Sequence, residues 1–250
     1  MFPITNDPHV FHAAFEAAAL SIGAFYYRYL QHRDGVSVGD LLNGGKFAVL
    51  LGCIFGAAIG NKLVFWIEMP NLLPLYWNKP EVWFAGQSMV GGLLGALIGV
   101  ELAKKLSGAR NSTGDAFVFP VLLGLMIGRM GCFVAGLADG TYGTPTTLPW
   151  GVDFGDGIAR HPTQLYEIVF AAGLWLVLHR MRDRWSVQAG LLFKVMLCSY
   201  LGWRLLVDGL KPVPFDYGFG SSGIQLVCAI ALLFYAPLCL AQWRKSRVTT

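Results

Sequence analysis

The chain alternates between long apolar segments and short polar connectors. Several of the apolar segments approach the ~20 residues that an α-helix needs to cross a bilayer. The pattern predicts an all-α polytopic membrane protein, with residues 1–250 forming a single integral membrane domain. Seven transmembrane helices are expected, at residues 11–30, 46–67, 87–106, 116–136, 164–179, 189–210 and 222–242. The longest connector, residues 138–163, is rich in Gly, Pro and Thr.

The composition agrees with a membrane protein. Only 14% of the residues are charged, whereas a soluble domain carries about 25%. The basic residues lie at segment ends rather than in one patch, so no nucleic-acid partner is expected. The five cysteines show no CxxC spacing and lie in or beside apolar segments, which predicts neither a disulfide framework nor a metal site.

The distribution of Lys and Arg predicts the orientation. Most of the 19 basic residues fall on one side of the predicted spans, and the positive side is cytoplasmic. The N-terminus is therefore expected outside, the C-terminus inside, and residues 138–163 in an extracytoplasmic loop.

The N-terminal stretch "MFPITNDPHVFH" lacks the basic region of a secretory signal peptide, so the first apolar segment is expected to be retained.

This orientation brings polar residues of several spans to one depth, near the outer leaflet. They are Glu16, Lys62, Arg129, Gln164, Glu167, Arg204 and Asp208. Such groups are costly inside a bilayer, so they face the interior of a bundle, where they pair or bind a ligand. Two interpretations follow from the residues alone. The charges lock helices together as ion pairs, or the arginines bind the phosphate of an anionic lipid through their planar forks.

The sequence allows two interpretations of the role of each of three further residues. His161 precedes Pro162 and is either a hydrogen-bonding residue at a helix start or a proton acceptor. Tyr166 fits an interfacial anchor or a site residue. Cys132 lies three residues after Arg129 and is either a small packing residue or a thiol nucleophile beside a cation.

Three fragments together point to a known family. "GRMGCFVAGLADG", "RHPTQLYE" and "WRLLVDGLK" occur in this order in spans four to six, and they resemble the prolipoprotein diacylglyceryl transferase family. The resemblance implies a multi-pass enzyme of the bacterial cytoplasmic (inner) membrane, without metal or organic cofactor. It would move the diacylglyceryl group of phosphatidylglycerol to the thiol of a lipobox cysteine and release glycerol phosphate. Its partners would be phosphatidylglycerol, preprolipoprotein signal peptides and the lipid bilayer.

The resemblance also implies residue roles. Arg129 matches the signature arginine expected to hold the lipid phosphate, and Arg204 matches the arginine thought to help the displacement. Because the chain departs from the family at nearby positions, replacement proton acceptors would have to come from Glu16, Asp139 or His161, and the catalytic set that we expect is Arg129, Arg204, His161 and Glu16. The substrate-binding set that we expect is Arg129, Gly140, Gln164, Tyr166, Glu167, Asp208 and Lys62.

The chain departs from the family pattern at several positions. Cys132 and Ala135 replace two asparagines of the signature, and Leu137 replaces its glutamate. Val90 stands where the family has a histidine proposed as a base, and the usual tyrosine of the first span has no clear match. These departures leave open a paralogue with a different acceptor, or a non-catalytic phospholipid-binding membrane protein. A transporter is less favoured, because the sequence shows no internal repeat.

Overall fold

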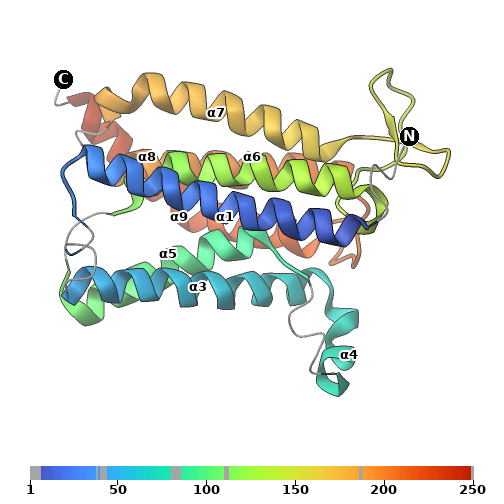
Figure 1. Ribbon diagram of the computed structural model, residues 1–250, viewed down its shortest axis with the longest axis horizontal. Helices are drawn as coiled ribbons and strands as arrows, with labels where there is room; N and C mark the ends of the chain where they lie inside the picture. Colours follow the sequence, from blue (N-terminus) through green and yellow to red (C-terminus); the bar gives the residue numbers. More distant parts are fainter. Residues whose placement is uncertain are drawn as a thin grey trace. The chain divides into compact units, whose positions relative to one another are not determined.

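The computed structural model describes residues 7–37, 39, 44–79, 86–109, 113–185 and 188–248 (Figure 1). Within these residues the fold is all-α. The α-helices are α1 (Pro8–Arg33), α3 (Gly44–Glu68), α4 (Leu73–Asn78), α5 (Met89–Ser107), α6 (Val118–Ala135), α7 (Thr163–Trp185), α8 (Leu191–Val207) and α9 (Gly223–Val248). Short 3-10 helices flank them: η1 (Pro70–Leu72), η3 (Gly114–Phe117), η4 (Gly136–Asp139) and η5 (Asp208–Leu210).

Each of the seven predicted spans coincides with one long helix, in the order α1, α3, α5, α6, α7, α8 and α9. The all-α prediction is confirmed. Among the described residues, three helical stretches are both long and apolar enough to cross a membrane: Gly45–Glu68, Gly114–Asp139 and Gly223–Lys245. Large apolar side chains such as Leu20, Phe25 and Phe234 are exposed on the helices, as lipid contact requires. The protein is therefore a polytopic membrane protein, while the count of seven spans stays a prediction.

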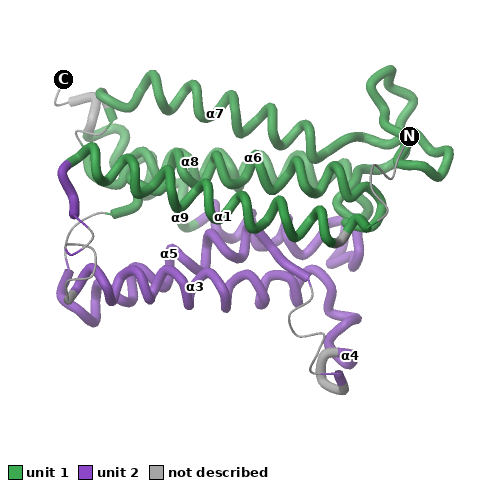
Figure 2. The backbone as a smooth tube through the Cα atoms, viewed as in Figure 1, with its two compact units in different colours: residues 1–34, 112–212, 234–250 green, residues 35–111, 213–233 purple. Residues whose placement is uncertain are grey.

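The chain divides into two compact units (Figure 2). Unit 1 comprises Met1–Asp34, Ser112–Pro212 and Phe234–Thr250, and it holds α1, α6, α7, α8 and the C-terminal part of α9. Unit 2 comprises Gly35–Asn111 and Val213–Leu233, and it holds α3, α4, α5 and the N-terminal part of α9. The prediction of a single integral membrane domain stays a prediction.

In unit 2, α3 and α5 pack backbone against backbone. Glycines recur every four residues on both helices: Gly52, Gly56 and Gly60 on α3, and Gly91, Gly95 and Gly99 on α5. A Cβ atom on Gly95 would overlap the Gly56 carbonyl oxygen, and one on Gly56 would overlap that of Gly95. Without a hydrophobic force between helices in lipid, such close van der Waals packing holds membrane helices together.

In unit 1, α6 packs between α1 and α7, and α7 also packs against α8. Gly131 allows the close approach of α1, because a Cβ atom there would overlap Phe15. Asp115 caps α8 from η3: its carboxylate accepts the backbone N–H of Gly190 at 2.6 Å and of Phe193 at 2.9 Å. The N-terminal end of α1, the C-terminal end of α6 and the start of α7 lie at the same end of this unit (Figure 1).

The connector between η4 and α7 is folded. Strands β1 (Val152–Asp153) and β2 (Ala159–Arg160) pair antiparallel, with Val152 opposite Arg160. Arg160 donates to both carboxylate oxygens of Asp156, at 2.6 and 2.7 Å. This hydrogen bonding lowers the pKa of Asp156, so the pair is intact at neutral pH. The connector thus fixes the position of the residues that lead into α7.

Candidate active site

A buried charge cluster lies at the centre of unit 1. Arg129 of α6 and Arg204 of α8 both face Glu167 of α7, whose side chain is fully buried. Arg129 Nε lies 2.8 Å from Glu167 Oε2, and Arg204 Nη1 lies 3.5 Å from Glu167 Oε1. The Arg129 N–H does not point at the oxygen, so this contact is an ion pair rather than a hydrogen bond. Tyr200 donates its hydroxyl to Glu167 Oε1 at 2.9 Å.

The cluster continues from Arg204 toward the end of α8. Arg204 donates two hydrogen bonds to the Asp208 carboxylate, at 2.9 and 2.8 Å. Lys211 Nζ lies 3.1 Å from the same carboxylate. Three cations therefore surround two carboxylates, which leaves one excess positive charge. Since a buried charge needs a counter-charge, this imbalance favours an anionic ligand.

A polar network borders Arg129 on the side of the connector. Gln164 is 1% exposed, and its Nε2 donates to Thr141 Oγ1 at 3.4 Å. Its Oε1 is buried without a hydrogen-bond donor among the described residues. Gly140 has a φ of 68°, in the left-handed region, and no atom lies within 4 Å of a Cβ built there. Glycine is therefore needed for its backbone conformation, and the space beside it is open.

The contacts recorded for the remaining predicted site residues are with other groups than the charge cluster. His161 Nδ1 is 3.2 Å from the Tyr166 hydroxyl, which accepts a hydrogen bond from Trp150 Nε1 at 2.8 Å. Glu16 is half-exposed on α1, and its nearest charged partner is His12, at 4.0 Å. Lys62 belongs to unit 2, where its Nζ donates to the Gly86 carbonyl at 2.6 Å. The roles of these residues stay predictions.

The structure adds a cluster that the sequence reasoning missed. His12 of α1, Cys132 of α6 and Asp139 of η4 converge beside Arg129. His12 Nε2 lies 3.0 Å from Asp139 Oδ1 and 3.6 Å from Cys132 Sγ. Arg129 Nη1 lies 3.8 Å from the same sulfur. In the sequence, His12 is marked by its position four residues before Glu16, on the same face of the first span.

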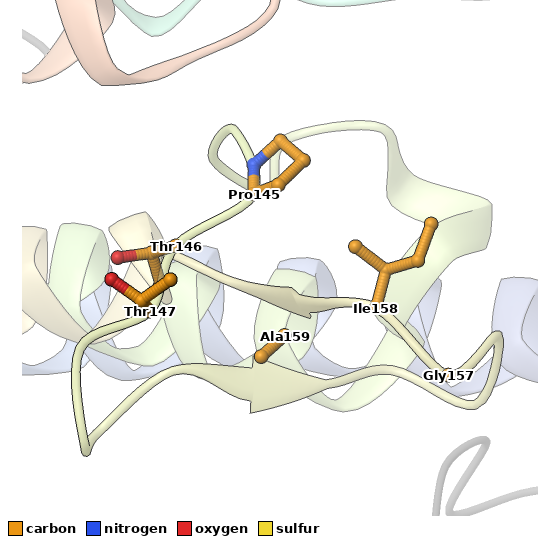
Figure 3. A pocket seen from close by; sticks show the side chains of 6 residues that line it. All are labelled: Pro145, Thr146, Thr147, Gly157, Ile158 and Ala159. Atoms are coloured by element: carbon orange, nitrogen blue, oxygen red, sulfur yellow. The ribbon is translucent and has the colours of Figure 1, made fainter.

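A hollow also lies on the connector hairpin (Figure 3). Its lining is Pro145, Thr146, Thr147, Gly157, Ile158 and Ala159. None of these side chains carries a charge or a proton acceptor strong enough for acid–base chemistry. The candidate chemistry therefore lies with the buried arginines rather than in this hollow.

Fold and site together define a polytopic α-helical membrane protein with a buried, net-cationic site. The sequence pattern of the family described as "Prolipoprotein diacylglyceryl transferase" matches residues 6–241. The chain belongs to the prolipoprotein diacylglyceryl transferase family, which confirms the resemblance read from the three fragments.

Curated relatives agree with this assignment. The chain is similar to phosphatidylglycerol–prolipoprotein diacylglyceryl transferase of Nitrosomonas europaea, at 35% identity over 84% of this chain and 78% of the relative. It is 31% identical to the enzyme of the same name from Geobacter sulfurreducens, over 72% of this chain and 71% of the relative. It is 30% identical to the enzyme of the same name from Bordetella parapertussis, over 78% of this chain and 74% of the relative.

Proposed function

We propose that this protein transfers the diacylglyceryl group of phosphatidylglycerol to the cysteine thiol of a prolipoprotein. Membership of the transferase family supports the reaction. The observation that carries the proposal for this chain is the excess positive charge of the Arg129–Glu167–Arg204 cluster. A phosphodiester carries one negative charge, which would neutralise this excess.

We also propose the membrane arrangement in which this reaction takes place. Seven helices span the bacterial cytoplasmic membrane, with the N-terminus outside and the C-terminus inside. The clustering of Arg129, Glu167 and Arg204 supports this arrangement, because the predicted topology requires those residues to share one depth. The site then faces the outer leaflet, from which a phospholipid enters with its acyl chains left in lipid.

In this function the two arginines act on the phosphate. The thiolate sulfur of the acceptor attacks the glyceryl carbon, a C–S bond forms, and the C–O bond to phosphate breaks. The electron pair leaves with the phosphate oxygen, and glycerol phosphate is released. Arg129 and Arg204 stabilise the charge that develops on this oxygen. Glu167 and Asp208 hold the guanidinium groups in place before the substrate arrives.

Other polar groups bind the headgroup. Gln164 Oε1, which lacks a donor among the described residues, accepts a hydrogen bond from a glycerol hydroxyl. The open space beside Gly140 admits the substrate backbone. Cys132 is not the nucleophile of this reaction, because a diacylglyceryl thioether on its sulfur would be a dead end. A thioether sulfur is too poor a leaving group for a second transfer.

The test uses purified protein in detergent with labelled phosphatidylglycerol and a lipobox peptide. We expect release of glycerol phosphate together with a diacylglyceryl-modified peptide. Arg129→Ala should lower turnover by about 10²–10³-fold, the usual effect of removing a donor to a developing charge. Arg160→Ala, which removes an arginine paired within the connector, is the matched control and should retain activity. Tight lipid binding without release by the unmodified protein would instead indicate a non-catalytic phospholipid-binding protein.

A further inference from the structure

Three potential metal ligands converge beside the phosphate site. His12 offers Nε2, Cys132 offers Sγ and Asp139 offers a carboxylate oxygen, and these atoms all lie within 4.8 Å of one another. They come from α1, α6 and η4, so tertiary packing rather than a local turn brings them together. Cys132 is buried and Asp139 nearly so, while His12 is 29% exposed. The cluster is thus shielded but open on the His12 side.

His12 contacts both of the other potential ligands through the same ring nitrogen. A single nitrogen, Nε2, lies 3.0 Å from Asp139 Oδ1 and 3.6 Å from Cys132 Sγ. In a tetrahedral zinc site, the usual bond lengths place the nitrogen roughly 3.3 Å from an oxygen ligand and roughly 3.6 Å from a sulfur ligand. The observed nitrogen–sulfur separation matches this geometry, and the nitrogen–oxygen separation is slightly shorter than it.

The surrounding groups orient the three ligands as a metal site requires. Thr141 Oγ1 donates to Asp139 Oδ2, which leaves Oδ1 directed at His12. The Glu16 carboxylate lies 4.0 Å from His12 Nδ1, the nitrogen opposite Nε2. Arg129 Nη1 donates a hydrogen bond to Cys132 Sγ at 3.8 Å. Carboxylates behind ligating histidines and hydrogen bonds to the other ligands are regular features of metal sites.

The charges also balance. A thiolate and a carboxylate together carry two negative charges, which a divalent cation neutralises. The ion would therefore add no net charge beside Arg129 and would leave the phosphate site with its single excess positive charge. Three protein ligands leave the fourth tetrahedral position open, which is the arrangement of catalytic rather than structural zinc sites.

We propose that His12, Cys132 and Asp139 bind a zinc ion whose open position takes the thiol of the acceptor cysteine. This inference rests on the proposed function. On binding, the thiol loses its proton to water, since a coordinated thiol is deprotonated. The bound thiolate attacks the glyceryl carbon, the C–S bond forms, and the phosphate leaves with the electron pair of the broken C–O bond. The metal site thereby supplies the deprotonation that a histidine base at the position of Val90 would otherwise provide.

The first experiment measures metal without any substrate. Full-length protein, purified in detergent and equilibrated with micromolar zinc, should retain one zinc per chain. His12→Ala, Cys132→Ser and Asp139→Asn should each weaken zinc binding at least about 10-fold. Cys53→Ser, a cysteine of unit 2, is the matched control and should bind zinc normally. Thermal unfolding of each variant identifies any that fail to fold, and the remaining ligand variants then decide the result.

Substitution with Co²⁺ gives an absorption spectrum that would not appear if His12, Cys132 and Asp139 had only a structural role. Co²⁺ in the unmodified protein should show a sulfur-to-metal charge-transfer band and the visible spectrum of a tetrahedral ion. The band should vanish in Cys132→Ser and persist in Cys53→Ser. Binding of less than one zinc per chain, or a cobalt spectrum unchanged in Cys132→Ser, would overturn the proposal.

The second experiment distinguishes a failure of the proposed zinc site from a failure of the proposed transferase function. Removal of zinc by a chelator should lower diacylglyceryl transfer to the lipobox peptide at least about 10-fold, and added zinc should restore it. Full transfer by metal-free protein would overturn the zinc site while leaving the proposed function intact. Stoichiometric zinc binding without transfer would contradict the proposed function and leave the metal site standing.

Discussion

At the scale of single residues, Glu167 determines the electrostatics of the site. It is fully buried between Arg129 and Arg204 and also accepts the Tyr200 hydroxyl. Both arginines are buried as well, so water cannot solvate the charge of either guanidinium group. Removing one partner of a buried ion pair leaves an uncompensated charge, which is more costly than the pair is stabilising.

Glu167→Gln keeps the size and shape of this side chain and removes its charge. We expect it to lower the free energy of unfolding by about 3–5 kcal/mol, because Arg129 then loses its ion pair with Glu167 and Arg204 keeps only its pair with Asp208. Tyr200→Phe, which removes only the hydrogen bond to Glu167, should cost about 1 kcal/mol. Thermal unfolding in detergent compares the two. Equal losses in both variants would mean that Glu167 acts through its hydrogen bond alone.

The buried arginines could be predicted from the sequence, but the histidine–cysteine–aspartate cluster could not. Arg129 and Arg204 interrupt apolar runs, and a charge inside a membrane span indicates a partner and a function. His12 lies at the polar edge of the first span, four residues before Glu16, but that spacing does not connect it to Cys132 or Asp139. Its partners Cys132 and Asp139 are more than a hundred residues away, so no local spacing connects them. Only the packing of α1 on α6 brings them together.

At the scale of elements, the α3–α5 pair depends on the absence of side chains. Gly95 and Gly56 leave no room for a Cβ atom on either helix, since each would overlap the carbonyl of the other. Even alanine must therefore push the two backbones apart, and the van der Waals contacts that hold the pair would weaken along the whole stripe.

Gly95→Ala should destabilise unit 2 measurably, while Gly92→Ala should not. Gly92 lies on the same helix as Gly95, but a Cβ atom on it meets only the Ala57 carbonyl oxygen of α3, at 4.0 Å, which is an ordinary contact. Both changes raise helix propensity equally, so the comparison isolates the packing. We expect Gly95→Ala to lower the free energy of unfolding by about 1–3 kcal/mol, the usual effect of overpacking. Equal melting temperatures for the two variants would contradict the close approach of α3 and α5.

Helix positions were more predictable than helix ends. The apolar runs located all seven long helices, because in lipid only a helix satisfies its own backbone hydrogen bonds. The fifth was expected at residues 164–179, yet α7 continues to Trp185 through a charged stretch that carries no apolar signal. Helix α4 (Leu73–Asn78) lies in a connector read as irregular, because its two leucines and a proline give too short a pattern to indicate a helix.

At the scale of the whole molecule, the proposed orientation determines which side of the membrane the substrates come from. The residues that form the Arg129–Glu167–Arg204 cluster lie near the C-terminal ends of α6 and α8 and the N-terminal end of α7. If the C-terminus is cytoplasmic, α9 runs inward, α8 outward and α7 inward. The cluster then lies toward the outer leaflet, where a secreted prolipoprotein presents its cysteine.

Reporter fusions test this orientation. Alkaline phosphatase folds only outside the cytoplasm, so a fusion after Gly157, in the connector before α7, should be active. The same reporter fused after Gln188, between α7 and α8, should be inactive, and green fluorescent protein at the C-terminus should fluoresce. The two phosphatase fusions differ by a single helix, α7 (Thr163–Trp185), so opposite activities would require that α7 crosses the membrane. An active fusion at both positions would remove α7 from the spans, and an inactive fusion at Gly157 with an active one at Gln188 would invert the orientation. The inverted orientation would place the arginine cluster out of reach of a secreted acceptor, and the proposed reaction would then need a cytoplasmic one.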